Sequence, residues 1–266
     1  MAITINGNSS ALIAAKMLEK ANTGLSESIE RMATGRQLNS AADDASGMII
    51  ADSLKSQSLA AGQEIRNASD NVSITQTADG AMGGITDVLQ NIRTQALNAA
   101  SGANSPNSLS AIQSDIQGSL DTIDDIAGNT SYNGQNLLDG TYNTNTLSIG
   151  SLATSNLGSP ENGFLRDIDI STPEGAQQAI EIVDSAIEQV AQNRSTVGAA
   201  QNQYTSDISN MPTAQINMMA SEYEIRDADI AEESMIYSQM KLLEGVATYT
   251  LNQSNSSNEA LVNLLG

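Results

Sequence analysis

Apolar residues recur at helical spacing through most of the chain. In the first segment they fall three or four positions apart, at Ala11, Ala14, Leu18, Ala21, Leu25, Ile29 and Met32. Such spacing is typical of a helix with one apolar face. Thr34 and Gly35 follow as a helix stop, because glycine readily adopts the left-handed conformation that ends many helices. We therefore predict an amphipathic helix over residues 11–33 that needs a packing partner.

The next helix is predicted to start in the stretch QLNSAADDASGMIIADS, Gln37 to Ser53. Ser40 is a favourable N-cap, and Asp43 and Asp44 then place negative charge in the first turn, where the helix dipole favours it. Apolar residues continue in steps of mostly three and four until Gly102. We expect a helix of about 55 residues, which would measure roughly 80 Å.

A third helix is predicted over 107–127 and a fourth, long one after STPEGAQQAI. Ser171 and Glu174 form a capping-box pattern there, with Pro173 inside the first turn. Pro212 has no N–H to donate and crowds the preceding turn, so we expect a break or kink over 209–212. Arg194 and Gln201 interrupt the apolar seam of this helix. They either fix the register between helices or lie at its solvated edge.

Residues 128–169 differ in character from the rest. Gly, Asn, Ser and Thr dominate, YNGQNLLDG holds two turn signals, and TLSIG and FLRDIDI alternate apolar and polar residues. This pattern predicts short strands in a hairpin region at about 131–170. The last helix is expected to begin near Asp227 or Asp229, and its apolar stripe predicts an antiparallel association with the first helix. The predicted fold class is mostly α, a long antiparallel coiled coil or bundle with a small β-hairpin region.

Composition removes most kinds of catalytic chemistry. The 266 residues include no Trp, one Phe and six Tyr, so burial depends on many small aliphatic contacts. The absence of His and Cys excludes Ser-His-Asp and Cys-His triads, structural zinc and disulfides. The acids of RDADIAEES are read as a helix N-terminus, because the Gly and distant Glu of a calcium loop are missing. We predict a protein that is not an enzyme and holds no cofactor or metal.

The net charge of −20 disfavours nucleic acid and anionic membranes as partners. Repulsion between copies also predicts that salt favours their packing. The N-terminus has no basic leader followed by an uninterrupted apolar core, so a Sec-type signal peptide is not expected. No stretch is long and apolar enough for a membrane span.

The motifs together carry a family resemblance. LNSAADDASGMIIADSL resembles the N-terminal signature of bacterial flagellins, and it is joined in the family's order by SITQTADGAM, YNGQNLLDG, NRSTVGAAQNQY, IRDADIAEES and ALVNLLG. DDASGMIIADSLKSQ is similar to flagellins of the ε-proteobacterial kind. These motifs cover essentially the whole chain.

The resemblance implies a structural subunit that self-assembles into the helical flagellar filament used for swimming. An inner domain would combine 1–33 with 232–266, and a rod-like helical domain over 34–231 would complete a minimal two-domain form. Ser40, Asp43 and Asp44 would form a capped elbow. Family termini order on assembly, which implies an interface built from Leu18, Leu25, Ile29, Met32, Ile236, Met240, Leu243, Leu261 and Leu264. Implied partners are an export chaperone and the cap and junction proteins, and implied export is by the flagellar type III route to the cell exterior.

One departure from the family concerns the animal flagellin receptor. Flagellins that it detects carry a basic-acidic-leucine pattern where this chain has LQNIRTQALNAA. Arg93 matches, whereas Asn91, Thr94 and Gln95 stand where the family pattern has Arg, Glu and Leu. With Gln90 and Asp115 these residues make up the receptor-like region, and we predict weak receptor activation.

Two other functions stay open at this point. A hook–filament junction protein shares the terminal signatures but differs through the middle, where NGQNLLDG and NRSTVGAAQNQY match flagellins. A secreted coiled-coil module that binds a foreign helix would stay monomeric at high concentration, so self-assembly separates it from a flagellin.

Overall fold

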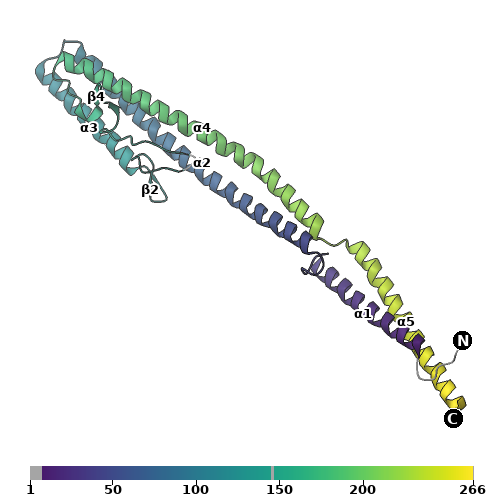
Figure 1. Ribbon diagram of the computed structural model, residues 1–266. Helices are drawn as coiled ribbons and strands as arrows, with labels where there is room; N and C mark the ends of the chain where they lie inside the picture. The colour runs from purple at the N-terminus through teal and green to yellow at the C-terminus, as the bar shows by residue number, and fades with distance from the viewer. Residues whose placement is uncertain (1–7, 145–146, 266) are drawn as a thin grey trace. The chain divides into compact units, whose positions relative to one another are not determined.

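The computed structural model describes residues 8–144 and 147–265, with side chains described as far as residue 260 (Figure 1). This described part folds into five α-helices, a short 3₁₀ helix and four two-residue strands. The elements are α1 (Ser9–Thr34), α2 (Ala45–Ala100), α3 (Pro106–Asn129), β1 (Ser131–Tyr132), β2 (Gln135–Asn136), β3 (Gly158–Ser159), β4 (Gly163–Phe164), η1 (Leu165–Asp167), α4 (Pro173–Arg226) and α5 (Ile230–Leu265). The predicted fold class, mostly α with a small hairpin region, is confirmed.

The chain divides into two compact units. Unit 1 contains residues 1–60 and 214–266, and unit 2 contains residues 61–213. The boundaries therefore fall inside α2 and α4, not in the loops. The sequence-based division at 33/34 and 231/232 follows the family's inner domain and stays a prediction.

In unit 1, α1 and α5 run antiparallel along each other (Figure 1). Near one end of the pair, the Ser28 hydroxyl donates to the Glu233 carbonyl at 3.2 Å. Near the other end, the Ser254 hydroxyl donates to Asn8 Oδ1 at 2.7 Å. The predicted antiparallel association of the first and last helices is therefore confirmed.

The loops between helices in unit 1 are tied to each other by backbone hydrogen bonds. The Gln37 amide donates to the Arg226 carbonyl at 2.8 Å, and the Ala228 amide donates to the Gly35 carbonyl at 3.0 Å. Gly35 has a φ of 69°, the left-handed conformation predicted for the end of α1. The connection that follows α1 and the connection that follows α4 are therefore hydrogen-bonded to each other.

Unit 2 holds a continuous aliphatic core between α2, α3, α4 and the segment 131–172. Its largest fully buried side chains are Met82, Ile85, Leu89, Ile92, Ile116, Leu120, Ile123, Leu137, Leu138, Ile149, Leu152 and Leu157. Aliphatic contacts replace aromatic anchors here, as the composition predicts.

Paired side-chain bonds attach the irregular segment to the helices of unit 2. Gln113 on α3 donates to the Ile168 carbonyl at 3.0 Å and accepts from the Ile170 amide at 2.9 Å. Asp124 on α3 accepts from both the amide and the hydroxyl of Thr154, at 2.7 and 2.8 Å. Because each side chain satisfies two polar groups, a segment with little regular structure is still held in one arrangement.

Several local predictions are wrong in detail. α2 begins at Ala45, so Ser40 is not its N-cap, and Asp43 and Asp44 precede the helix instead of lying in its first turn. Asp44 takes the capping position, because its carbonyl accepts from the Met48 amide at 3.0 Å and its carboxylate from the Ser46 amide at 3.0 Å. This shift occurs because the Asp43 carboxylate instead closes a turn by accepting from the Ser40 amide at 2.8 Å.

The start of α4 is also displaced, by one residue. Thr172, not Ser171, is the cap, since its hydroxyl accepts from the Gly175 amide at 3.0 Å and its carbonyl from the Ala176 amide at 2.9 Å. The Ser171 amide donates to Asp169 Oδ1 at 2.9 Å, which keeps Ser171 in the preceding turn.

The break predicted over 209–212 is not observed, whereas the alternative, a kink there, stays a prediction. α4 passes from Pro173 to Arg226 with Pro212 inside it. A helical proline removes one hydrogen bond and adds a clash, at a cost of about 3 kcal/mol, which the flanking turns of a 54-residue helix can absorb. The FLRDIDI stretch contributes one strand residue, Phe164, and then turns into η1, so the strands are shorter than predicted.

Candidate assembly interface

The paired helices α1 and α5 expose ten large apolar side chains, which we call together the α1–α5 face. Its members are Leu12, Ile13, Met17, Ile29, Ile230, Met235, Leu242, Leu243, Val246 and Tyr249. Of the sixteen large hydrophobic side chains exposed in the described part of the chain, fifteen lie in unit 1 and the remaining one, Leu97, lies in unit 2. Apolar exposure is therefore concentrated in one unit.

Small residues in the helix contact explain why the large ones face outward. Ala14, Ala21 and Ser28 follow one another at intervals of seven and are buried to 2% exposure or less. A seven-residue interval keeps them on one side of α1, and their size lets α5 approach closely. Gly24 lies beside Met240, whose Sδ would be 3.1 Å from a Cβ placed on Gly24. Leu25 is also buried in this seam, whereas larger apolar residues such as Ile13, Met17 and Ile29 are left outside it.

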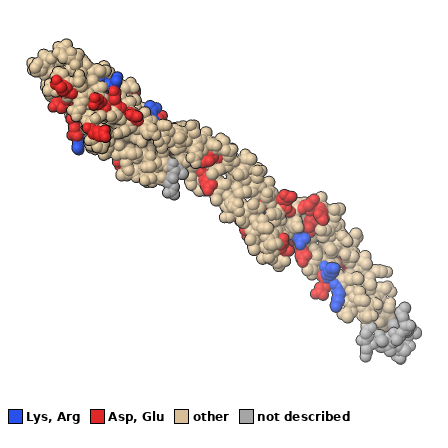
Figure 2. Space-filling view, turned by 45° about the horizontal axis from the view of Figure 1, so that its top comes forward, with Lys and Arg blue, Asp and Glu red and all other residues tan. Residues whose placement is uncertain are grey.

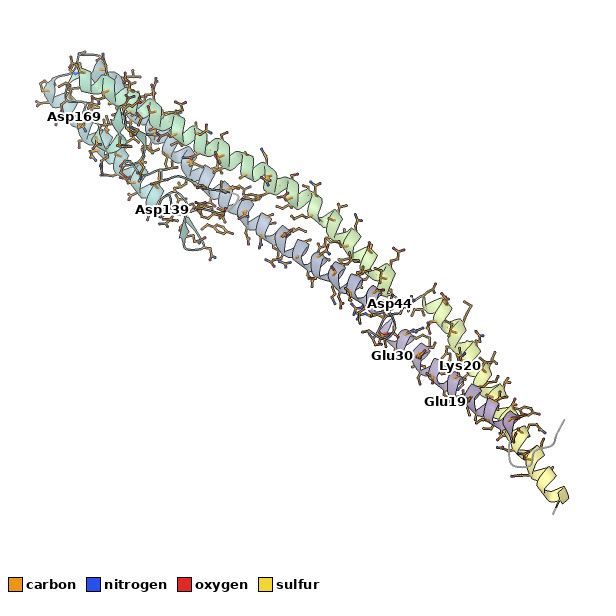
Figure 3. All side chains as sticks on the ribbon, viewed as in Figure 1. Glu19, Lys20, Glu30, Asp44, Asp139 and Asp169 are labelled. Carbon is orange, nitrogen blue, oxygen red and sulfur yellow. The ribbon has the colours of Figure 1, made fainter. Side chains whose placement is uncertain are left out.

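A groove of about 640 Å³ runs between the two helices. Most of its lining is apolar: Ile13, Ala14, Met17, Ala21, Met240, Leu243, Val246 and Ala247, accompanied by Ser10, Lys20, Gln239 and Thr250. Figure 3 labels Lys20 on α1. In Figure 2 the surface directly next to the grey terminal residues is mainly tan, with blue and red side chains further along. The groove can therefore make dispersion contacts with an apolar partner, and it has few polar groups that could fix the orientation of that partner.

The nine residues predicted for the interface do not all share one environment. Leu25 is buried in the α1–α5 contact, and Leu18, Met32, Ile236 and Met240 are half-buried. Ile29 and Leu243 are exposed and belong to the α1–α5 face. The side chains of Leu261 and Leu264 lie outside the described residues.

Sequence reasoning missed several exposed members of the face. Leu12, Ile13, Met17, Leu242 and Val246 lie next to the seam positions along the chain, not on them. The sequence does hold a signal for them. In a helix that contacts only one other helix, the surface away from the contact is normally polar, whereas here it carries apolar residues. A second apolar face on the same helix indicates a further partner.

The residues proposed as an elbow sit where α1 connects to α2, and Figure 3 labels Asp44 at the start of α2. Backbone hydrogen bonds from Ser40 and Asn39 hold the pKa of Asp43 below its ordinary value. The pKa of Asp44 is lowered first by a backbone hydrogen bond from Gly47 and then by the Ser46 hydroxyl. A Cβ on Gly47 would lie 2.5 Å from Asp44 Oδ2, so only glycine allows this close cap.

The receptor-like region lies in unit 2, mainly on α2. Arg93 Nε is 2.6 Å from Asp184 Oδ1 on α4, and this hydrogen bond raises the pKa of Arg93. Gln90, Asn91 and Thr94 are exposed, as is Asp115 on α3, whereas Gln95 Oε1 is buried with no hydrogen-bond partner. The one residue that matches the family pattern is thus already paired within the chain.

The described part of the chain holds no candidate metal centre. No three His, Cys, Asp or Glu side chains in it are placed to share a metal ion. Asp229, an acid of RDADIAEES, caps α5 by accepting from the Ala231 amide at 2.8 Å. Within the same residues, no helix has the length and apolar character that crossing a membrane requires.

These features define a helical structural protein whose paired end helices carry an unsatisfied apolar face. The model of the bacterial flagellin N-terminal helical region matches residues 5–143, and that of the C-terminal helical region matches 180–265. The chain belongs to the bacterial flagellin family, whose members are structural subunits of the flagellar filament and not enzymes.

Two sequence relatives agree with this assignment. The chain is 30% identical to the flagellar filament 33 kDa core protein of Treponema phagedenis, covering 98% of this chain and 99% of that one. It is 28% identical to polar flagellin A of Vibrio parahaemolyticus, covering 100% of both. The crystal structure of Bacillus cereus flagellin matches with 26% identity and a TM-score of 0.48, covering 55% of this chain and 88% of that one.

The comparisons also agree with a minimal form. Only residues 144–179 separate the two matched family regions. The Vibrio alignment extends over 376 positions, more than the 266 residues of this chain, so the Vibrio protein has residues that this chain lacks. Matches along the full length also disfavour the junction protein and the helix-binding module.

Proposed function

We propose that copies of this chain polymerise by burying the α1–α5 face against neighbouring subunits, and that this contact holds the flagellar filament together. The observation that carries the proposal is the concentration of exposed large apolar side chains in unit 1, with a groove along α1 and α5. Leu18, Leu25, Met32, Ile236 and Met240 support the α1–α5 pairing. Ile29 and Leu243, with the rest of the face, make the contact between subunits.

The size of the face is sufficient for this role. Fully burying a large aliphatic side chain contributes about 1.5–3 kcal/mol, and half-exposed members retain roughly half of that. The ten members of the face therefore offer on the order of 10 kcal/mol per subunit before the entropic cost of association is subtracted. Repulsion between subunits of net charge −20 opposes assembly, and moderate salt screens it.

The test is seeded polymerisation of the purified full chain beside a trimmed chain of residues 34–231. Both are incubated with and without short filament seeds in moderate ammonium sulfate and viewed by negative-stain electron microscopy. The trimmed chain keeps the core of unit 2, and circular dichroism verifies that it is helical. Long filaments from the full chain alone support the proposal and the sequence-based domain boundaries. Filaments from the trimmed chain, or none from either, contradict it.

We further propose the export route and helper proteins that the family resemblance implies. The subunit travels unfolded through the flagellar type III route to the cell exterior, escorted by an export chaperone, and polymerises beneath cap and junction proteins. What supports this is family membership and the match of LNSAADDASGMIIADSL and ALVNLLG to the family's terminal signatures. Secretion that persists in cells without a functional flagellar export gate would contradict it.

Weak activation of the animal flagellin receptor is proposed as well. Asn91, Thr94 and Gln95 do not match the activating pattern, and Arg93 is paired with Asp184. A reporter-cell assay compares purified monomer with a strongly stimulatory flagellin at equal concentration. Equal responses would contradict the proposal.

A further inference from the structure

Three methionines give the α1–α5 face a chemical property beyond apolar contact. Met17 is 60% exposed and Met235 is 67% exposed, on α1 and α5 respectively. Met240 on α5 lines the groove together with Met17. Met82, in contrast, is fully buried in the core of unit 2. In an unassembled subunit the exposed thioethers of Met17 and Met235 can therefore meet a dissolved oxidant, whereas the buried thioether of Met82 cannot.

The packing of Met240 determines where an added oxygen would point. Its sulfur and Cγ lie against Gly24, with Sδ 3.1 Å and Cγ 3.3 Å from the place that a Cβ would take. One side of the Met240 side chain therefore faces α1 at Gly24. Because Met240 also lines the groove, an oxygen on its sulfur would lie at the surface where a neighbouring subunit is expected to pack.

We propose that Met17, Met235 and Met240 are oxidation sites whose state decides whether a free subunit can join the filament. The oxidant is a peroxide, taken here as hydrogen peroxide. The O–O bond breaks and one oxygen atom bonds to the methionine sulfur, which loses two electrons. The peroxide gains those electrons and leaves as water. The inference rests on the proposed function of the α1–α5 face.

The physical reason for the effect is the change in polarity. A sulfoxide is a polar group with a strong acceptor oxygen, whereas the thioether is apolar. The side chains of Ile13, Leu243 and Val246 carry no donor, so burying this oxygen against them carries a desolvation penalty. Assembled subunits should be protected, because the contact covers the sulfur atoms. Methionine sulfoxide reductases restore the thioether, so the block is reversible.

The experiment uses the full chain. Monomer is treated with limiting hydrogen peroxide, the oxidant is removed, and elongation from untreated seeds is followed by light scattering and electron microscopy. Peptide mass spectrometry measures sulfoxide at each methionine. The test variant carries Met17→Leu, Met235→Leu and Met240→Leu, which keep the face apolar at similar volume. The matched control carries Met218→Leu and Met219→Leu, two half-buried methionines of unit 1 on α4, outside the groove.

The inference predicts more sulfoxide at Met17 and Met235 than at Met82, and a fall in wild-type elongation of at least about fivefold. The triple variant should keep its elongation after peroxide, the control variant should lose it, and reductase treatment should restore the wild type. Equal elongation by wild-type subunits with and without sulfoxide at the three sites overturns the inference while leaving the proposed function intact. Restoration that fails although the sulfoxides are reduced also overturns it. Failure of untreated subunits to elongate is instead a failure of the proposed function.

Discussion

Replacing Ile13 by Gln should weaken polymerisation without weakening the folded subunit. Ile13 lies on α1, lines the groove and is 56% exposed. Its remaining exposed area corresponds to about half of the roughly 1.5–3 kcal/mol that full burial of an isoleucine contributes, or about 1–1.5 kcal/mol. Since about 1.4 kcal/mol is a tenfold change in an equilibrium constant, the critical concentration should rise roughly five- to tenfold.

The same reasoning applies to Val246 on the α5 side of the groove, which is 61% exposed. Val246→Gln should raise the critical concentration by a similar factor. The critical concentration is measured by sedimenting seeded reactions at equilibrium and assaying the unpolymerised subunit.

Two controls separate the contact from the fold. Ile13→Leu keeps the site apolar at equal volume, so its critical concentration should stay close to that of the wild type. Thermal unfolding of Ile13→Gln monomer should match the wild type, because substitutions at exposed positions usually change stability by less than about 0.5 kcal/mol. Critical concentrations of Ile13→Gln and Val246→Gln within twofold of the wild type would refute the reasoning.

Three further predictions concern the fold. Pro212→Ala should restore a backbone donor within α4 and raise the free energy of unfolding by roughly 1–3 kcal/mol; an unchanged or lower denaturant midpoint would show that proline is favourable there. The ion pair of Arg194 and Asp79, at 2.8 Å, is about 40% exposed on both sides, so a double-mutant cycle with Arg194→Met and Asp79→Asn should give a coupling below about 1 kcal/mol. Because the pKa of Asp44 in the folded state is below its ordinary 3.8, its contribution is present above that pH and is lost as the pH falls below it. Asp44→Asn keeps the cap acceptor, so its melting temperature should fall less on acidification below about pH 4 than that of the wild type, and parallel curves would contradict this assignment.

Much of the fold follows from local signals in the sequence. The first helix was predicted over 11–33 and spans Ser9–Thr34, because its apolar repeat and its Gly35 stop are both local. The antiparallel pairing of α1 and α5 could be predicted because each carries a stripe with no other partner. Where several nearby residues could each cap a helix, the sequence pattern does not determine which of them does so. Ser40 and Asp44 are both good caps, and only the turn closed by Asp43 decides between them.

The candidate interface was harder to predict than the helices. A stripe of apolar residues indicates that a helix needs a partner, but it does not separate the partner in the same chain from a partner in another copy. Here the small residues Ala14, Ala21 and Ser28 occupy the intrachain contact, and Ile13 and Met17 are left exposed. That distinction depends on the rotation of α1 about its own axis against α5, which sequence spacing alone does not determine.

The most direct test of the account is a helical reconstruction by cryo-electron microscopy of filaments grown from this chain alone. The account predicts that the groove lined by Ile13, Met17, Leu243 and Val246 is filled by apolar side chains of a neighbouring subunit. A filament in which this groove stays open to solvent, with subunits joined through other surfaces, would contradict it.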